Sequence, residues 1–434
     1  DETILNSNSQ ISARVATFNG GSWLSVLLDG AGSFRFVLPY KVTARHISGM
    51  NEGDYLGSIT TTGSSLPADN KLVNVTFRVT SQPLLRASPD TLRVRIAQNV
   101  TRTVKFIDLS NRGLGTLSFT AVTANITTGA GWLTAEKIAD ADLVSLAFNT
   151  TGLAPGVYLA TVGFTSNAIN NPSVIVPVTL EVVAQAAPLA FTDGVVSNAT
   201  FEGGDTLAKG LIAAVFGEQF LLGDPVSASS LPLGTDLGGV RVFVADRPAP
   251  VYYASYDQVN FQIPYDAPAG QEVLVRVERA GQRGNSVAVR IVDSAPRILR
   301  LRIADYGILV NQDGTFPIPP TPGLPSRRAR TGDVLVGYVL GGGPTAPPVQ
   351  SGVGAPSSTL AMVPAQFRAV FGAGVVGTQT VPVQLLFFGR TPNFVGLYQV
   401  NFPITDAVPR GNAVPLTLEG PAGIRSNTVT IAVV

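Results

Sequence analysis

The stretch Tyr256-Asp257-Gln258-Val259-Asn260-Phe261-Gln262-Ile263 recurs near the end of the chain as Leu397-Tyr398-Gln399-Val400-Asn401-Phe402-Pro403-Ile404. In both copies amide side chains alternate with apolar ones, so Gln258 and Asn260 share one face of an extended chain and Val259 and Phe261 share the other. A period of two residues is typical of β-strands with one face on a core. The repeat therefore predicts two similar β domains in the second half of the chain.

A different repeat marks the first half. Gly21-Ser22-Trp23-Leu24 returns as Gly131-Trp132-Leu133, and Glu52-Gly53-Asp54-Tyr55-Leu56 returns as Pro155-Gly156-Val157-Tyr158-Leu159. We expect Trp23 and Trp132 at equivalent core positions, each packed under the strand that carries Tyr55 or Tyr158. Together the two repeats predict an all-β chain of four tandem immunoglobulin-like β-sandwich domains of two types.

Linkers between the repeats indicate the domain boundaries. They are Ser81-Gln82-Pro83, residues 184–188 and Ser294-Ala295-Pro296. The predicted domains are 1–83, which is partial, then 84–187, 188–296 and 297–434, the last with a proline-rich loop at 316–325. Pro177 lacks a backbone N–H, so its strand is expected at a sheet edge or with a bulge. Residues 206–216 are the best candidate for a short helix.

Composition excludes several classes of function. The 434 residues carry a net charge of +1, and such a chain has no general field to attract nucleic acid or an anionic membrane. Only 14% of the residues are charged, against about 25% in an ordinary soluble domain. No run approaches the ~18 apolar residues that would span a bilayer. The absence of cysteine excludes a disulfide scaffold, a thiolate metal site and a cysteine nucleophile.

The same composition suggests a compartment. A cysteine-free chain of β repeats rich in Thr, Ser, Asn and Gly favours a bacterial, secreted, extracellular or cell-surface protein that does without disulfides. Asp1 is not a translation start, so we expect a mature or trimmed product. His46 is the single histidine, and one histidine without a recognisable nucleophile elbow does not predict a catalytic triad.

The second predicted domain resembles the BACON domain, a β-sandwich module of bacterial surface proteins and glycoside-hydrolase assemblies. The resemblance rests on four phrases, and the first predicted domain matches only through Trp23, Tyr55 and its closing strand. The phrases are Ala87-Ser88-Pro89, Gly131-Trp132-Leu133-Thr134, Leu153-Ala154-Pro155-Gly156-Val157-Tyr158 and Val176-Pro177-Val178-Thr179-Leu180. The resemblance implies a fold and a compartment, with carbohydrate binding proposed for that family by association.

Residues from about 190 to 434 resemble a paired C-terminal module of uncharacterised secreted soil-bacterial proteins, related to immunoglobulin-like IPT/TIG domains. The matching phrases are 231–240, Ala249-Pro250-Val251-Tyr252-Tyr253, 394–401 and Ser426-Asn427-Thr428-Val429-Thr430-Ile431. This resemblance implies a fold and a secreted location, without an activity. Gly341-Gly342-Gly343 departs from the family pattern and lacks the Lys-Ser/Thr of a phosphate-binding loop, so we expect a turn there.

Several side-chain groups are candidates for binding. The amides Gln258, Asn260, Gln399 and Asn401 are expected to hydrogen-bond loop backbone groups, with a ligand row as the alternative. Coplanar exposed aromatics would mark a glycan site, and the candidates are Tyr252, Tyr253, Tyr256 and Tyr398. Residues 327–330 (Arg-Arg-Ala-Arg) form a solvated or interface cluster, or hold an anionic glycan.

No cofactor is expected. Calcium stays open as an alternative, because Asp140 and Asp142, or Asn311-Gln312-Asp313-Gly314, supply oxygen atoms without forming an EF-type loop.

Two functions compete for this chain. The leading hypothesis is a non-enzymatic extracellular structural or adhesive protein, a rod of sandwiches that forms a homo-oligomer or polymer or anchors to a surface. The alternative is a carbohydrate-binding protein with a polysaccharide partner, and an enzyme comes third.

The first predicted domain lacks roughly two strands before Trp23. Either that segment was removed, or a neighbouring chain supplies strands by intermolecular β contacts in the residue 1–20 region, which would build an open filament.

Overall fold

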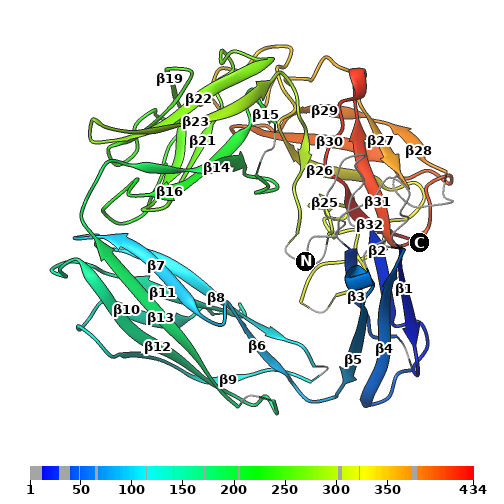
Figure 1. Ribbon diagram of the computed structural model, residues 1–434. Helices are drawn as coiled ribbons and strands as arrows, with labels where there is room; N and C mark the ends of the chain where they lie inside the picture. Colours follow the sequence, from blue (N-terminus) through cyan, green and yellow to red (C-terminus); the bar gives the residue numbers. More distant parts are fainter. Residues whose placement is uncertain are drawn as a thin grey trace. The chain divides into compact units, whose positions relative to one another are not determined.

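The structure is a computed structural model that describes residues 12–28, 40–47, 49–63, 67–113, 115–139, 141–170, 172–203, 206–301, 305–321, 323–372 and 379–434. These residues form 32 β-strands and two short 3-10 turns, η1 (Pro67–Asp69) and η2 (Pro421–Gly423), and no α-helix (Figure 1). The prediction of an all-β chain of tandem sandwiches is thereby confirmed. In the part of the chain that the structure describes, no helix has the length and apolar character to cross a membrane.

The chain divides into two compact units. The first comprises Asp1–Val94, Val104–Ala147 and Tyr158–Thr179, and the second comprises Arg95–Thr103, Phe148–Val157 and Leu180–Val434. We name the sandwiches by their strands: β1–β5 form the first, β6–β13 the second, β14–β23 the third and β24–β32 the fourth. Residues 80–84, 184–188 and 293–296 lie between these sets of strands. The boundaries of the four predicted domains stay predictions.

The first sandwich has two small sheets, one of order β1-β4-β5 and one that pairs β2 with β3. Its buried apolar cluster among the described residues is Trp23, Leu24 and Ile59, and the Phe77 ring stacks on Trp23 with 5.3 Å between ring centroids. The strands are β1 (Ser12–Thr17), β2 (Leu24–Leu28), β3 (Tyr40–Ala44), β4 (Gly53–Thr62) and β5 (Leu72–Val79).

The second sandwich has two four-stranded sheets, of order β10-β11-β8-β6 and β7-β13-β12-β9. Pro177 lies in β13, between β7 and β12, so β13 is not the edge strand that was expected as one alternative, and a bulge at Pro177 stays a prediction. The strands are β6 (Leu85–Ser88), β7 (Leu92–Ala97), β8 (Thr103–Asn111), β9 (Phe119–Ile126), β10 (Leu133–Lys137), β11 (Leu143–Phe148), β12 (Gly156–Ser166) and β13 (Ser173–Val183).

The two tryptophans occupy equivalent places in these sandwiches. Both are 1% exposed, and each indole Nε1 donates to the carbonyl four residues earlier, Trp23 to Asn19 at 2.9 Å and Trp132 to Thr128 at 2.8 Å. Tyr158 meets Trp132 edge-on with 6.4 Å between ring centroids, and Tyr55 packs on the cluster that contains Trp23. Strands β1 to β5 therefore correspond to β9 to β13.

Residues 1–20 were expected to form an intermolecular contact. Residues 1–11 lie outside the described residues, and β1 pairs antiparallel with β4 of its own chain, from Ser12 opposite Thr62 to Thr17 opposite Gly57. Its counterpart β9 is likewise an edge strand. β1 therefore has the same single neighbouring strand as its counterpart in the second sandwich.

The third sandwich packs two five-stranded sheets, of order β14-β16-β21-β20-β17 and β15-β23-β22-β18-β19, around one apolar cluster. Its strands are β14 (Leu189–Ser197), β15 (Leu207–Ala208), β16 (Ile212–Glu218), β17 (Val226–Ser227), β18 (Val240–Val244), β19 (Arg247–Ala249), β20 (Val251–Ala254), β21 (Gln258–Gln262), β22 (Gln271–Arg279) and β23 (Gln282–Val292).

The expected helix over residues 206–216 is wrong, because that segment contains β15 and most of β16. Gly210 turns the chain between them at φ 73°, and a Cβ there would lie 2.2 Å from the Tyr265 ring. β16 is a central strand, and residues 212–215, which alternate between its two faces, are all apolar and buried. A continuous apolar run does not distinguish a buried strand from a buried helix.

The fourth sandwich has its own cluster between a sheet of order β24-β26-β30-β29, with β25 paired to β26, and a sheet of order β28-β27-β31-β32. Its strands are β24 (Arg297–Ile298), β25 (Leu309–Val310), β26 (Val334–Leu340), β27 (Arg368–Phe371), β28 (Val381–Gln384), β29 (Phe387–Arg390), β30 (Leu397–Pro403), β31 (Gly411–Glu419) and β32 (Val429–Val433).

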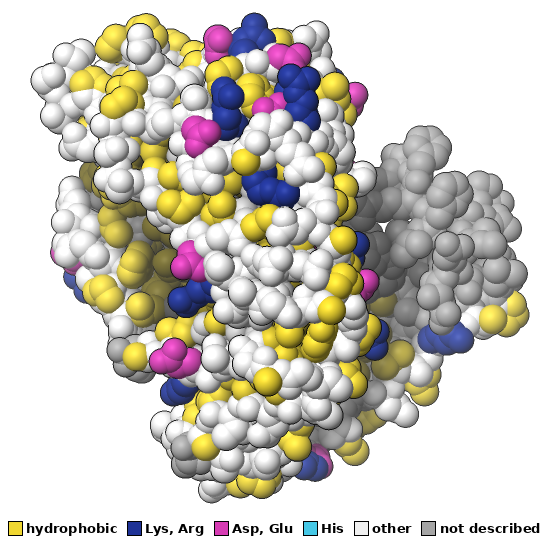
Figure 2. Space-filling view, turned by 90° about the vertical axis from the view of Figure 1, so that its left-hand side faces the viewer, with side chains coloured by type: hydrophobic (Ala, Val, Ile, Leu, Met, Phe, Trp, Pro, Cys, Tyr) yellow, Lys and Arg dark blue, Asp and Glu magenta, His cyan; other side chains and the backbone are white. Residues whose placement is uncertain are grey.

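Charged side chains on the third sandwich pair with one another. Arg276 contacts Asp246 and Glu278, each at 3.3 Å, and Arg283 contacts Glu278 at 3.2 Å. On the face drawn in Figure 2, dark blue and magenta side chains are interleaved near the top and sparse elsewhere. This mixed pattern agrees with a net charge near zero and offers no single-sign patch on that face.

Candidate functional site

The repeated amides lie where the alternation places them, on strands β21 and β30. Gln258 Nε2 donates to Asn260 Oδ1 at 2.7 Å, and Gln399 Nε2 donates to Asn401 Oδ1 at 2.9 Å. Loop backbone groups were the expected partners, whereas in both copies the paired amides bond to each other. The sequence repeat is thus a repeated local geometry, with the apolar neighbours of these amides buried in the two cores.

The four tyrosines proposed as glycan contacts do not form an exposed platform. Tyr256 is 2% exposed and Tyr398 is fully buried, while Tyr252 and Tyr253 are half-buried. A sugar stacks on an exposed ring face, so Tyr256 and Tyr398 present no such surface in this structure. Tyr256 lies in the turn between β20 and β21, and Tyr398 belongs to the buried apolar cluster of the fourth sandwich.

Tyr256 instead joins the second and third sandwiches. Its hydroxyl accepts a hydrogen bond from the backbone N–H of Ala97 at 2.9 Å, inside the second compact unit. Burial raises the pKa of Tyr256 well above its usual range, because the phenolate would lose its hydration. The hydroxyl therefore stays protonated and remains a fixed hydrogen-bonding group at this junction.

A buried arginine lies at the junction of the third and fourth sandwiches. Arg390, at the end of β29, is 0% exposed, and its guanidinium donates to the Tyr265 hydroxyl and, at 3.3 Å, to the Phe394 carbonyl. Its Cζ lies 5.6 Å from the ring centroid of Tyr265 and 5.3 Å from that of Tyr398. Cation–π attraction strengthens when the pair is desolvated, so the rings take the place of a carboxylate partner.

The tyrosines around Arg390 are bonded in turn. The hydroxyls of Tyr265 and Tyr398 lie 3.0 Å apart, Tyr398 donates to the carbonyl of Gly343, and Tyr252 donates to that of Val395 at 2.9 Å. Burial, followed by the nearby Tyr265 hydroxyl, raises the pKa of Tyr398. We call Arg390, Tyr252, Tyr265 and Tyr398 the junction cluster. Sequence reasoning missed it, because Arg390 belongs to no motif.

Gly341, Gly342 and Gly343 let the backbone pass close beside this cluster. A Cβ on Gly341 would lie 2.4 Å from the Ala295 carbonyl oxygen, one on Gly342 2.5 Å from the Tyr398 ring, and one on Gly343 2.5 Å from the Asp293 carbonyl oxygen. The expected turn is therefore also a packing site, where only glycine fits between two sandwiches.

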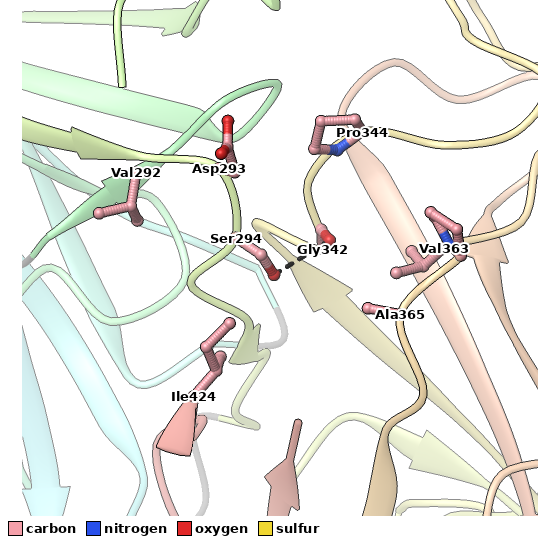
Figure 3. A pocket seen from close by; sticks show the side chains of 9 residues that line it. Val292, Asp293, Ser294, Gly342, Pro344, Val363, Ala365 and Ile424 are labelled. Atoms are coloured by element: carbon pink, nitrogen blue, oxygen red, sulfur yellow. Dashed lines mark hydrogen bonds between the residues drawn. The ribbon is translucent and has the colours of Figure 1, made fainter. Parts of the chain in front are cut away.

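A cavity of about 630 Å³ is lined in part by Gly342 of this segment (Figure 3). Ser294 Oγ, which also lines it, donates to the Gly342 carbonyl at 3.1 Å, and Asp293 forms an ion pair with Lys209 at 3.0 Å. The lining residues are Val292, Asp293, Ser294, Gly342, Pro344, Val363, Pro364, Ala365 and Ile424. This lining suits an apolar group, and its one carboxylate already has a partner, so it offers no acid–base pair.

The arginine segment 327–330 forms internal bonds. Arg327 pairs with Asp313 at 2.5 Å and with Asp333 at 2.7 Å, and Arg328 donates to Asn412 at 2.8 Å. Hydrogen bonds from Thr315, then from Arg327, hold the pKa of Asp313 far below its usual range. The carboxylate of the 311–314 segment is therefore committed to these partners.

The remaining candidates do not converge. Asp140 lies outside the described residues and His46 is exposed. Over the described ranges, no cluster of three or more His, Cys, Asp or Glu side chains could hold a metal ion.

No family model matches the chain, and no curated protein matches it. Similar solved structures include domains 4–9 of the surface layer protein SbsC, with TM-score 0.25 and 12% identity over 95% of this chain and 73% of that chain. The human desmocollin-1 ectodomain matches with TM-score 0.20 and 10% identity over 95% and 72%. An endo-fucoidan hydrolase of glycoside hydrolase family 107 matches with TM-score 0.19 and 11% identity over 67% of this chain, which spans 43% of that hydrolase. Likenesses at these TM-scores carry no argument about function, and the BACON and IPT/TIG resemblances stay predictions.

Proposed function

We propose that this chain is a non-enzymatic extracellular structural or adhesive protein that associates with copies of itself. The observation that carries the proposal is that, within the second compact unit, side chains bond the third sandwich to the fourth, to the linker 184–188 and to residues 95–103. Connected domains with small polar interfaces move relative to each other by default. Bonded junctions are what a protein needs when it must hold a spacing or transmit a load.

The junction of the second and third sandwiches supports this proposal. Besides the bond from Ala97 to Tyr256, Thr101 donates to Asp224 at 2.9 Å, and Arg95 pairs with Glu218. The linker itself is bonded, since Ala186 donates to Gln219 at 2.7 Å and accepts from Arg279 at 2.9 Å. Every one of these contacts lies within the second compact unit.

The junction of the third and fourth sandwiches adds buried contacts to the junction cluster. The side chain of Gln262 is 0% exposed; it donates to the Gly210 carbonyl at 3.1 Å and accepts from the Gly352 N–H at 2.6 Å. The Tyr265 N–H donates to Ser351 Oγ at 3.0 Å. Buried hydrogen bonds of this kind cost free energy when one partner is removed, so they favour one orientation.

The test combines sedimentation velocity of the whole chain over a wide concentration range with binding to a glycan array. We expect reversible, concentration-dependent association and no sugar bound. A strict monomer that binds a defined glycan would overturn the proposal in favour of a carbohydrate-binding protein. Truncating Tyr253, which is half-buried and lies outside the junction cluster, to Ala would then test whether that tyrosine contacts the sugar.

A further inference from the structure

The loop between β1 and β2 contains Asn19-Gly20, the one Asn-Gly pair in the sequence. Asparagine is chemically labile, because the backbone nitrogen of the next residue can attack its side-chain amide and release ammonia. Glycine as the next residue favours this attack most, since it has no Cβ to hinder the approach. Both residues are exposed, so water has access to them. The loop thus presents a reactive dipeptide to the one co-reactant that its conversion needs.

Two hydrogen bonds attach the Asn19 side chain to the backbone of β4. Its Oδ1 accepts from the N–H of Leu56 at 2.8 Å, and its Nδ2 donates to the carbonyl of Asp54 at 3.2 Å. Attack by the Gly20 nitrogen closes a cyclic imide, which draws the side-chain amide onto its own backbone and away from β4. Both bonds must therefore break first, and the reaction proceeds through local opening of the loop.

The second sandwich makes the same contact without an amide. Thr128-Gly129 takes the place of Asn19-Gly20, and Thr128 Oγ1 accepts from the N–H of Leu159 at 2.6 Å, as Asn19 Oδ1 does from Leu56. The hydrogen bond to the tryptophan four residues later is also shared. A hydroxyl is therefore sufficient to hold this loop, and the labile amide distinguishes the first sandwich from the second.

The glycine of this pair is fixed by packing. Gly20 has φ 76°, and a Cβ there would lie 2.1 Å from the Tyr55 ring. Gly129 has φ 75°, and a Cβ there would lie 2.9 Å from the Tyr158 ring. Both copies of the motif thus require glycine at this position. The reactivity of the pair consequently depends on the residue before the glycine, which is asparagine in one copy and threonine in the other.

We propose that Asn19 is a self-modification site, at which the folded chain deamidates at a rate set by opening of the loop. The Gly20 nitrogen loses its proton and bonds to Asn19 Cγ, the Cγ–Nδ2 bond breaks, and ammonia leaves. Water then opens the cyclic imide. Cleavage of the new bond at Cγ gives an aspartyl residue, and cleavage at the backbone carbonyl carbon gives an isoaspartyl residue. Neither step involves a change of oxidation state.

The products alter the contacts that hold Trp23. Loss of Nδ2 removes the hydrogen bond to the carbonyl of Asp54 and leaves a carboxylate oxygen beside that carbonyl. In the isoaspartyl product the main chain runs through Cγ and is longer by one methylene group. The carbonyl that accepts from Trp23 Nε1 at 2.9 Å then becomes a free carboxylate outside the main chain. Modification therefore loosens the tryptophan of the first sandwich, and this inference goes beyond the proposed function because it requires no second copy.

Peptide mass spectrometry of the whole chain, incubated in mildly alkaline buffer made with ¹⁸O-labelled water, tests the proposal. We expect the peptide that contains Asn19 to lose ammonia and gain a labelled oxygen, at least tenfold faster in guanidinium chloride than in the folded chain. Asn285 is an internal control, because two hydrogen bonds to Ala190, at 2.7 and 2.9 Å, hold its amide but Ser286 follows it; it should stay unmodified in the folded chain. Absence of conversion at Asn19 in the folded chain, or equal rates with and without denaturant, would overturn the proposal.

Two substitutions test the consequence for the loop, with Trp23 fluorescence followed in a Trp132→Phe chain. Asn19→Thr copies the residue of the second sandwich and should keep the Trp23 signal while abolishing the incorporation of labelled oxygen at this position. Asn19→Gln keeps an amide but adds a methylene group, which disfavours ring closure, so it should react at least tenfold more slowly. During incubation the Trp23 signal should decay with the same rate as deamidation, and only in the chain that carries Asn19. Equal decay in Asn19→Thr would show that the modification does not loosen the tryptophan.

Discussion

The first and second sandwiches share a repeat but differ in how completely they cover it. Both place a tryptophan with the same backbone hydrogen bond under the same strand. The second sandwich surrounds its tryptophan with eight strands, whereas the described part of the first uses five. The tryptophan and the strand that packs on it therefore form a local packing unit. The stability of each sandwich depends in addition on the strands that cover its sheet edges.

The largest expected difference is the response to removing each tryptophan. Trp132→Ala should destabilise the second sandwich by about 3–5 kcal/mol, because a tightly packed core relaxes little around the cavity. Trp23→Ala should cost the first sandwich about half of that or less, since the half-buried side chains around it can collapse into the gap. Amide hydrogen exchange, followed peptide by peptide, measures both losses in one chain. Trp→Phe variants serve as controls, and equal losses would show that the two cores are equally complete.

Matched valines sharpen the comparison at one strand position. Val176→Ala removes buried methyl groups and should destabilise its sandwich by about 1–3 kcal/mol. Val73→Ala, at the corresponding position of β5, should change the free energy of unfolding by less than about 0.5 kcal/mol, as expected for an exposed side chain. Urea unfolding at low protein concentration tests this on a monomer. A loss at Val73 as large as that at Val176 would mean that something covers β5 under those conditions.

The sequence predicted the strands whose two faces differ, because alternation carries that information. Val259 and Phe261 are buried beneath the repeated amides, as the period of two indicated. β16 was misassigned because both of its faces are buried, which erases the period. The junction cluster could not be predicted, because its members are far apart in the sequence. Tyr265 lies 125 residues from Arg390 and 133 residues from Tyr398. No local pattern records which domain covers a strand face.

The smallest expected difference is a pH response of the first sandwich that arises from two of its carboxylates. A hydrogen bond from Arg78, and its charge, lower the pKa of Asp54, and hydrogen bonds from Ser81 lower the pKa of Glu52. The corresponding positions of the second sandwich are Val157 and Pro155, which carry no carboxylate. A group whose pKa is depressed by folding stabilises the folded state above its unfolded pKa, and this stabilisation is lost as the pH falls through the folded value.

Acidification from pH 6 to pH 3 should therefore remove the stabilisation that Asp54 and Glu52 give to the first sandwich and lower its unfolding midpoint. The second sandwich has no carboxylate at these two positions and should not show this contribution. The two tryptophans report the sandwiches separately, Trp23 in a Trp132→Phe chain and Trp132 in a Trp23→Phe chain. The shift should be small and weaker in high salt, because both carboxylates are exposed and screened. Asp54→Asn in the Trp132→Phe chain should reduce the acid response of the Trp23 signal. An unchanged response in that variant would show that the Asp54–Arg78 bond between β4 and β5 does not form in solution.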